Sequence, residues 1–252
     1  MASEGSAFQD FLMSRVMKGA KIEGKLWEDA HFVLADVPLH AEAVKRILPL
    51  GLRPSDPPLA TLFICDYKKT GFTVPYKESA VLIHVRSIFG EGYHCCWMPV
   101  DDDTAMIYGR ELLGYPKKMA DIVFEENENG VSASVTRRGV EVLTMEGKRG
   151  ALQSSPPPIF DVKTFNVGGL GQFMAVNPVW LFRPTEVIHE SYEAEVTITV
   201  AESEYDPIAG LIAGDAIRGR MAVIDILGAP YMLPVGLAGI PWSNRTFFMR
   251  YR

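Results

Sequence analysis

The sequence predicts a mainly β (α+β) protein, built on an antiparallel, barrel-like sheet with few short helices. Three observations support this prediction. Apolar and alternating runs of strand length recur along the chain, tight turns or Pro-rich loops join them, and helical spacing is confined to short segments. The 252 residues, 48% of them hydrophobic, are enough to bury a sizeable core, so we expect a single domain over residues 1–252.

The elements before residue 101 are expected in the following order. Helical spacing of Phe8, Phe11, Leu12 and Val16 predicts a short amphipathic helix over residues 6–18, within an N-terminal helical extension of residues 1–24. A second short helix over residues 40–48 ends at a proline and a glycine. A loop rich in proline covers residues 52–58. Strands are expected over residues 26–36, 59–67, 79–89 and 93–100, the last two joined as a hairpin by a turn at residues 90–92.

The second half begins with a three-stranded meander over residues 119–126, 131–138 and 140–147, in which the Asn129-Gly130 step predicts a tight turn. Prolines in residues 154–158 predict a rigid connection that crosses between parts of the sheet. Further strands are expected over residues 160–167, 172–182, 187–200 and 221–227, and a helical turn over residues 207–213. The aromatic residues Phe247, Phe248 and Tyr251 of the tail are expected to be buried. The total is about ten strands and about two or three short helices.

Two adjacent lysines, Lys117 and Lys118, follow a predicted helix over residues 101–114. Three aspartates at residues 101–103 supply an N-cap and a negative first turn, where the helix dipole favours anions. Gly114 is a candidate for the glycine that follows a helix end, and Pro116 prevents continuation of the helix. We therefore expect both lysines on a turn that holds them in one place.

A fixed lysine is chemically useful because a neutral amine attacks ketones. At a usual pKa of about 10.4, a lysine is almost wholly protonated near neutral pH. Removal from water or a second cation nearby lowers the pKa of a lysine. Adjacent side chains on an extended chain point to opposite faces. Two sources of activation therefore stay open for Lys117, namely burial and the neighbouring Lys118.

The lysine segment resembles the active-site segment of the acetoacetate decarboxylase family. The matching residues are Gly109-Arg110-Glu111-Leu112-Leu113-Gly114-Tyr115-Pro116-Lys117-Lys118. Two weaker similarities are Tyr76-Lys77-Glu78-Ser79, which resembles a segment with an active-site glutamate, and residues 222–227, which resemble a C-terminal strand. Acetoacetate decarboxylase is itself a well-known example of a lysine nucleophile activated by its surroundings.

The resemblance implies a role for four residues. Lys117 would form the Schiff base, and Lys118 would be its charged neighbour. Glu78 would orient the substrate or move protons, and Tyr115 would line the pocket, although packing on Pro116 explains Tyr115 equally well. The resemblance also implies a conical antiparallel barrel wrapped by additional sheet, with the lysine in its apolar interior, and a homo-oligomer.

The sequence departs from the family pattern at two places. The stretch Trp27-Glu28-Asp29-Ala30 has no arginine where family decarboxylases carry one. A second family glutamate corresponds to about Phe63, and the nearest acidic residue is Asp66. Both departures concern the choice of substrate more than the Schiff-base chemistry.

The resulting prediction is a Schiff-base lyase that decarboxylates a small β-keto acid such as acetoacetate. It needs neither a metal nor an organic cofactor, because the iminium accepts the electrons. One alternative is an aldolase-dehydratase that uses the same lysine on a pyruvate-like keto acid. Another is a barrel that binds a small ligand without turnover.

Composition limits the other function classes. A formal net charge of −6 is unfavourable for nucleic-acid binding. Residues 1–24 lack the apolar core of a signal peptide and no long apolar run follows, so we expect neither secretion nor membrane insertion. Cys65, Cys95 and Cys96 fit a reduced, cytoplasmic protein. His94, Cys95 and Cys96 are consecutive on a strand, whose alternation prevents all three from binding one metal ion.

Overall fold

The computed structural model describes residues 25–169, 176–229 and 232–252. Its first elements are β1 (Trp27–Pro38), α2 (Ala41–Ile47), β2 (Arg53–Pro54), β3 (Leu59–Thr70), β4 (Tyr76–Ser87) and β5 (Gly90–Val100). The middle elements are α3 (Asp103–Glu111), β6 (Lys117–Met119), β7 (Asp121–Asn127), β8 (Gly130–Arg137) and β9 (Val140–Leu152). The last elements are β10 (Thr164–Val167), β11 (Val176–Phe182), β12 (Thr185–Val200), η1 (Ala209–Leu211), β13 (Arg218–Gly228), β14 (Met232–Gly239), α4 (Ile240–Arg245) and α5 (Phe247–Arg250).

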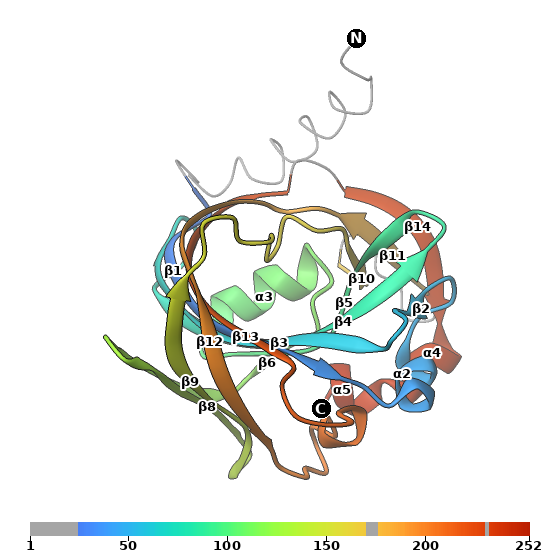
Figure 1. Ribbon diagram of the computed structural model, residues 1–252. Coiled ribbons are helices and arrows are strands. Elements are labelled where there is room, and N and C mark those ends of the chain that lie inside the picture. The colour runs from blue at the N-terminus through green and yellow to red at the C-terminus, as the bar shows by residue number, and fades with distance from the viewer. Residues whose placement is uncertain (1–24, 170–175, 230–231) are drawn as a thin grey trace.

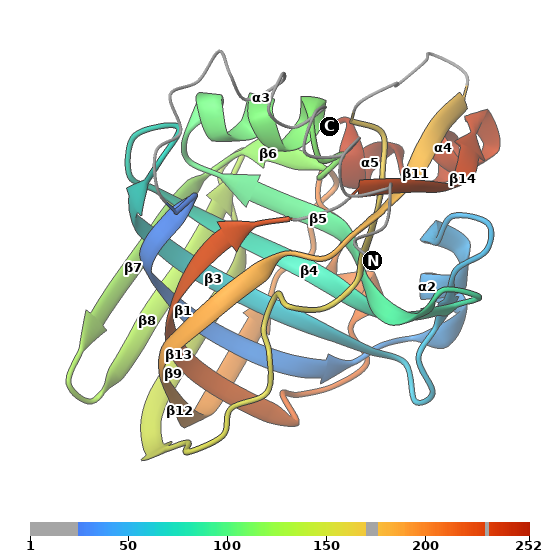
Figure 2. The ribbon, with the colours of Figure 1, turned by 90° about the horizontal axis from the view of Figure 1, so that it is seen from above.

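A single mixed sheet of 14 strands dominates the fold and confirms the mainly β prediction. Its main path runs β14-β11-β10-β5-β4-β3-β1-β13-β12-β9-β8-β7, with β2 beside β4 and β6 beside β5. The strands curve around α3, which lies over one end of the sheet (Figures 1 and 2). The conical form of the barrel stays a prediction.

The pairing is antiparallel except at β5, which corrects the purely antiparallel expectation. Both β10 and β6 lie parallel to β5, with Thr164 opposite Tyr93 and Met98 opposite Lys117. Parallel neighbours need long connections. The connection from β5 to β6 contains α3, so the helix that precedes the lysines is also what returns the chain to the sheet.

The central strands are buried on both faces. Val33 and Ile64 belong to one hydrophobic cluster, which also contains Trp97. Their neighbours Phe32 and Phe63 belong to a second cluster. Because side chains alternate along a strand, the sheet separates the two clusters. This double burial explains why β1, β3 and β4 read as nearly continuous apolar runs.

The β4–β5 hairpin was predicted correctly, but its turn was not. Ser87 pairs with Gly90, so Ile88 and Phe89 form the turn in place of residues 90–92. Gly92 has a different task, because a Cβ there would lie 2.2 Å from the backbone oxygen of Lys163. The chain before β10 therefore approaches β5 closely enough to require a glycine.

Several other expectations are confirmed. Strands β7, β8 and β9 form the predicted antiparallel meander. The Pro-rich residues 154–158 connect β9 with β10, which lie in different parts of the sheet. Element η1 is the predicted helical turn.

Two further expectations stand differently. The helix predicted for residues 6–18 and the extension of residues 1–24 lie outside the described residues. The short strand β2 interrupts the predicted loop over residues 52–58.

The prediction for the tail is wrong in one respect. Residues 240–250 form α4 and α5, and Phe247, Phe248 and Tyr251 stay 43%, 37% and 40% exposed. The buried residues of α5 are Met249 and Arg250. The arginine docks the tail, because its guanidinium donates to the backbone oxygens of Gly114 and Val167 and so satisfies carbonyls inside the protein. No helix in the described ranges is long and apolar enough to cross a membrane.

The buried His94 on β5 makes the stability of the fold depend on pH. Its side chain is 2% exposed and its Nδ1 donates to the Phe165 backbone oxygen at 2.8 Å. Burial lowers the pKa of His94 to about 4, against an unperturbed value of 6.5. The unfolded chain therefore takes up a proton at a higher pH than the folded chain. The stability that the buried neutral His94 contributes is complete above pH 6.5 and is lost as pH falls toward 4.

We predict that His94 lowers the free energy of unfolding by about 2 kcal/mol between pH 7 and pH 5. Urea denaturation gives the free energy of unfolding of the parent protein and of His94→Gln at both pH values. The contribution of His94 is the difference between the two proteins in how much this free energy changes with pH. The control His40→Gln removes an exposed histidine and should keep the pH dependence of the parent protein. Equal pH dependence of His94→Gln and the parent would contradict the prediction.

Candidate active site

The segment before the lysines is fixed at both ends of α3. The Asp102 side chain accepts from the Ala105 backbone N–H at 2.7 Å, which confirms the predicted acidic N-cap. The C-cap is Leu112, so Gly114 lies further from the helix end than expected. Gly114 has a φ of 68°, and a Cβ there would lie 2.8 Å from the Val167 oxygen, so no other residue fits without movement.

Lys117 lies just past this helix, as predicted, but on strand β6 and not on a turn. Its side chain is 6% exposed. Its stem packs against α3 at Gly109, where a Cβ would lie 2.5 Å from Cδ and Cε of the lysine. The Arg110 guanidinium donates to the Lys117 backbone oxygen at 2.8 Å. Helix and strand together therefore hold the amine in one direction.

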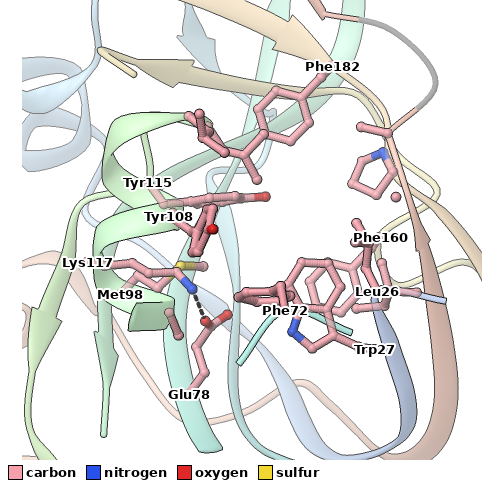
Figure 3. Close-up of a pocket in the computed structure, with 18 of the residues that line it drawn as sticks. Leu26, Trp27, Phe72, Glu78, Met98, Tyr108, Tyr115, Lys117, Phe160 and Phe182 are labelled. Atoms are coloured by element: carbon pink, nitrogen blue, oxygen red, sulfur yellow. Dashed lines mark hydrogen bonds and ion pairs between the residues drawn. The ribbon is translucent and has the colours of Figure 1, made fainter. Parts of the chain in front are cut away.

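The amine of Lys117 points at Glu78. Its Nζ donates to Glu78 Oε2 at 2.5 Å, and the Glu78 side chain is 5% exposed (Figure 3). Glu78 comes from β4, and its partner in the β5 register is Val100. The two predicted residues, separated by 39 positions in sequence, thus form a buried ion pair. A buried charge is costly unless it is paired, so each residue stabilises the other in this place.

Two tyrosine hydroxyls donate to the carboxylate of Glu78, and a tryptophan supports one of them. Tyr67 OH donates to Oε1 at 3.4 Å and Tyr76 OH to Oε2 at 3.5 Å. Trp27 Nε1 donates in turn to Tyr76 OH at 2.9 Å. Burial raises the pKa of Tyr67 and of Tyr76 well above the usual value, so both hydroxyls stay protonated donors. The Lys117 Nζ also lies 5.4 Å from the centre of the Tyr76 ring.

Lys117 and Glu78 face a pocket that is otherwise apolar (Figure 3). They are the only charged residues that line it among the described residues. The rest of the wall is aliphatic or aromatic, and its aromatic residues are Trp27, Tyr67, Phe72, Tyr108, Tyr115, Phe160 and Phe182. Tyr115 lies in this wall with its ring 5.8 Å from that of Phe182, in an edge-to-face arrangement. Burial raises the pKa of Tyr115 well above its usual value.

Lys118 does not face this pocket. Its Nζ donates to Asp206 Oδ1 at 2.9 Å and also to the Phe248 backbone oxygen. Asp206 accepts from Arg137 at 3.2 Å and from Trp97 Nε1 at 2.8 Å as well. Trp97 belongs to the hydrophobic cluster on the other side of the sheet from the pocket. The alternation of side chains along β6 therefore separates the two lysines.

The surroundings of Lys118 show which group its charge is paired with. Burial lowers the pKa of Lys118 to about 8, and the Asp206 carboxylate acts in the opposite direction. The ammonium has its own buried counter-ion on the far side of β6. Lys118 therefore presents its charge to Asp206 and not to the pocket that Lys117 lines.

Sequence reasoning missed most of the pocket wall. Tyr67 lies opposite Tyr76 in the β3–β4 register, but that register is visible only in the folded sheet. Both departures from the family pattern now have a structural place. Trp27 lines the pocket, and Phe63 is fully buried with its ring 5.6 Å from that of Phe160. In the part of the chain that the structure describes, no cluster of His, Cys, Asp and Glu side chains could hold a metal ion.

Comparison with known proteins identifies the group to which this chain is similar. The family model described as acetoacetate decarboxylase matches residues 14–236. The acetoacetate decarboxylase of Burkholderia vietnamiensis is 29% identical over 116 residues, which are 46% of this chain and 47% of that protein. Decarboxylase DEC1 of Cochliobolus heterostrophus is 32% identical over 101 residues, which are 38% of each protein. The matched part spans about half the length of these relatives, or less.

Solved structures share the fold over more of the chain. Acetoacetate decarboxylase from Legionella pneumophila has a TM-score of 0.72 at 15% identity, covering 85% of this chain and 88% of that chain. The enduracididine biosynthesis enzyme MppR, complexed with pyruvate, has a TM-score of 0.70 at 15% identity, covering 81% and 88%. At this identity the likeness shows a common fold.

We predict that Asp206→Asn destabilises the protein by about 3–5 kcal/mol, because it leaves Lys118 and Arg137 buried without their counter-charge. Urea denaturation measures the change in free energy of unfolding. Asp215→Asn, the same substitution at an exposed position, is the matched control and should change stability by less than about 0.5 kcal/mol. Equal stability of the two variants would show that the buried cluster contributes little.

Proposed function

Because the chain belongs to the acetoacetate decarboxylase family, we propose that it is a Schiff-base lyase that decarboxylates a β-keto acid such as acetoacetate. The observation that carries the proposal is the buried pair of Lys117 and Glu78 at an apolar pocket. A surface lysine would gain nothing from such an arrangement. A nucleophilic lysine gains a proton acceptor within 2.5 Å and protection from water.

The first step is formation of the Schiff base. Glu78 Oε2 accepts a proton from the Lys117 ammonium, and the neutral amine attacks the ketone carbon of the substrate. The carbinolamine then loses water, whose oxygen comes from the ketone, and a protonated imine remains on Lys117. Glu78 is placed to return the proton that this departure requires.

The second step breaks the carbon–carbon bond. The electron pair of the bond to the carboxylate moves toward the positive imine nitrogen, and carbon dioxide leaves. The product is a neutral enamine on Lys117. Protonation of its terminal carbon restores the iminium, and hydrolysis then releases the ketone and the lysine. Tyr67 and Tyr76 keep the Glu78 carboxylate directed at Lys117 during these proton transfers.

An aldolase-dehydratase is the second candidate, because an enamine on Lys117 can attack an aldehyde as readily as it takes a proton. Its support is the shared fold with MppR, which has been solved with the condensation product of pyruvate and imidazole 4-carboxaldehyde at a TM-score of 0.67 to this chain. Release of carbon dioxide distinguishes the first candidate from formation of a carbon–carbon bond. A binding protein without turnover would keep its ligand affinity in Lys117→Ala.

We predict that borohydride traps an acetoacetate-derived adduct on Lys117. Reduction after loss of carbon dioxide should leave an isopropyl group, which intact mass and peptide mapping identify. Lys117→Met should give no adduct. The methionine side chain is apolar and fits the pocket, so the variant removes only the amine. An adduct that retains the carboxylate would favour the aldolase-dehydratase. Absence of any adduct with acetoacetate and with pyruvate would reject the Schiff-base mechanism.

We predict that Glu78→Gln lowers kcat/KM by about 10²–10⁴-fold, because the amide keeps the shape of the side chain but cannot accept the lysine proton. The same substitution at the exposed Glu91 is the matched control and should leave kcat/KM unchanged. A fall of less than about threefold in Glu78→Gln would remove the carboxylate from the proton transfers.

We predict that Lys118→Met keeps the shape of the pH–rate profile, since the charge of Lys118 is paired with Asp206 on the far side of β6. The variant should be less stable than the parent, so the profile is measured well below its melting temperature. A shift of the profile toward higher pH would instead assign the activation of Lys117 to its charged neighbour.

A further inference from the structure

We propose that Asp225 is a positioning residue for the Schiff-base reaction, because it holds the backbone bulge that turns Trp27 into the pocket. The inference rests on the proposed function, since it concerns how Glu78 is kept in place beside Lys117. Asp225 lies on β13, on the face of the strand opposite to that of Ile226, which lines the pocket. Asp225 does not line the pocket itself, so its effect on the reaction must pass through its neighbours.

Strand β1 contains a β-bulge directly after Trp27. Trp27 pairs with Ile226 of β13, and the next residue of β1 that pairs with β13, Ala30, lies opposite Ile224. Two residues of β1 therefore stand opposite Asp225 alone. In a regular strand, residues three apart point to opposite faces, yet Trp27 and Ala30 pack in the same hydrophobic cluster. The bulge is therefore what places the Trp27 side chain in the pocket wall.

The bulge has an unfavourable backbone conformation that needs support. Asp29 has a φ of 53°, in the left-handed region that residues with a Cβ rarely adopt. Its backbone N–H donates to Asp225 Oδ1 at 2.9 Å. The second oxygen of Asp225, Oδ2, accepts from Lys25 Nζ at 2.5 Å and lies 2.7 Å from His189 Nε2. The Asp225 side chain is 4% exposed, so these groups take the place of water around it.

His189 comes from a second bulge, in the strand on the other side of β13. The register between β12 and β13 shifts between Ile188 and Glu190, which leaves His189 as the extra residue. Asp225 thus has a contact with a bulge in each neighbouring strand. Loss of its carboxylate would remove one support from the backbone on both sides of β13.

The carboxylate of Asp225 is a strong acceptor because it is ionised. Burial by itself would raise the pKa of Asp225, but hydrogen bonds from Lys25 and from the Asp29 N–H hold it at about 2. A hydrogen bond to a charged group favours the bonded arrangement by about tenfold or more. This is enough to offset the strain of one residue in the left-handed region.

Trp27 connects the bulge with the reacting pair. Its indole Nε1–H donates to the Tyr76 hydroxyl oxygen at 2.9 Å, and that hydroxyl donates to Glu78 Oε2 at 3.5 Å. Because an indole nitrogen can only donate, it directs the Tyr76 hydrogen away from itself and toward Glu78. The same Glu78 oxygen accepts from Lys117. If Trp27 left the wall that Figure 3 shows, the Tyr76 hydroxyl could turn away from the carboxylate.

The first test compares two substitutions of Asp225. Asp225→Ala removes the acceptor of the Asp29 N–H, so kcat/KM for acetoacetate should fall about tenfold or more. Asp225→Asn loses the charge but keeps an oxygen in the same place, and its kcat/KM should stay within about threefold of the parent value. Asp215→Ala, at an exposed position, is the control and should leave kcat/KM unchanged. Equal losses in Asp225→Ala and Asp225→Asn would overturn the inference.

A second substitution should rescue the first. Glycine adopts a positive φ without a steric cost, so Asp29→Gly makes the bulge independent of the Asp225 carboxylate. The double variant Asp225→Ala with Asp29→Gly should fold, even where Asp225→Ala alone does not, and its kcat/KM should return to within about threefold of the parent value. A double variant that is unfolded, or as slow as Asp225→Ala, would overturn the inference.

A third readout is independent of turnover. NMR of the protein with ¹⁵N-labelled tryptophan follows hydrogen exchange of each indole N–H, and Trp27→Phe identifies the Trp27 signal. Exchange at Trp27 should be about tenfold or more faster in Asp225→Ala than in the parent. Exchange at the buried Trp97, whose indole donates to Asp206 in the other hydrophobic cluster, should not change. Equal acceleration at both indoles would reflect lost overall stability and would overturn the inference.

The readouts separate failure of the inference from failure of the proposed function. If the parent forms an adduct with acetoacetate on Lys117 without releasing carbon dioxide, the decarboxylase is rejected. The rate of adduct formation then replaces kcat/KM, with the same expected ratios among the variants. If the parent forms no adduct, both the Schiff-base function and the role of Asp225 in it are rejected, whatever the exchange rate at Trp27.

Discussion

The rest of the site depends on one buried ion pair, that of Lys117 with Glu78. Two opposite charges are buried at an acceptable cost only when they are paired with each other. The 2.5 Å contact between Lys117 on β6 and Glu78 on β4 satisfies this condition. The pair also fixes which face of β6 meets the pocket. If β6 were turned over about its own axis, Lys117 would lie in the opposite hydrophobic cluster. Alternation then sends Lys118 to Asp206, which supplies a second buried pair on the other face. One strand thus presents Lys117 to the pocket on one side and Lys118 to a second buried ion pair on the other.

The C-terminal helix completes this arrangement. Arg110 donates to the backbone oxygens of both Lys117 and Arg250, and Arg250 donates to the oxygen of Gly114. Lys118 donates to the oxygen of Phe248 in the same helix. These contacts join residues 248–250 to both ends of the lysine segment, although more than 100 positions separate them in sequence. The tail is therefore a structural support of the segment that carries Lys117.

The local features of the site could be predicted from the sequence, and the long-range ones could not. Aspartates before α3 and Pro116 after it carry their own conformational signals, so the position of Lys117 after a helix was predictable. The match to the family added Glu78. That Lys117 and Lys118 point to opposite faces follows from alternation along an extended chain. The partner of Lys118, the aromatic neighbours of Glu78 and the exposure of Phe247 depend on strand register and on docking of the tail. Register is a property of paired strands, and no single segment of sequence encodes it.

The central claim is that the pair of Lys117 and Glu78 is the reacting centre of an apolar pocket. A crystal structure of the protein reduced with borohydride in the presence of a β-keto acid tests this claim most directly. We expect electron density that continues from Lys117 Nζ into the space between Glu78 and the aromatic wall, with Lys118 still paired with Asp206. Density attached to Lys118 or to a surface lysine, with Lys117 unmodified beside Glu78, would contradict it.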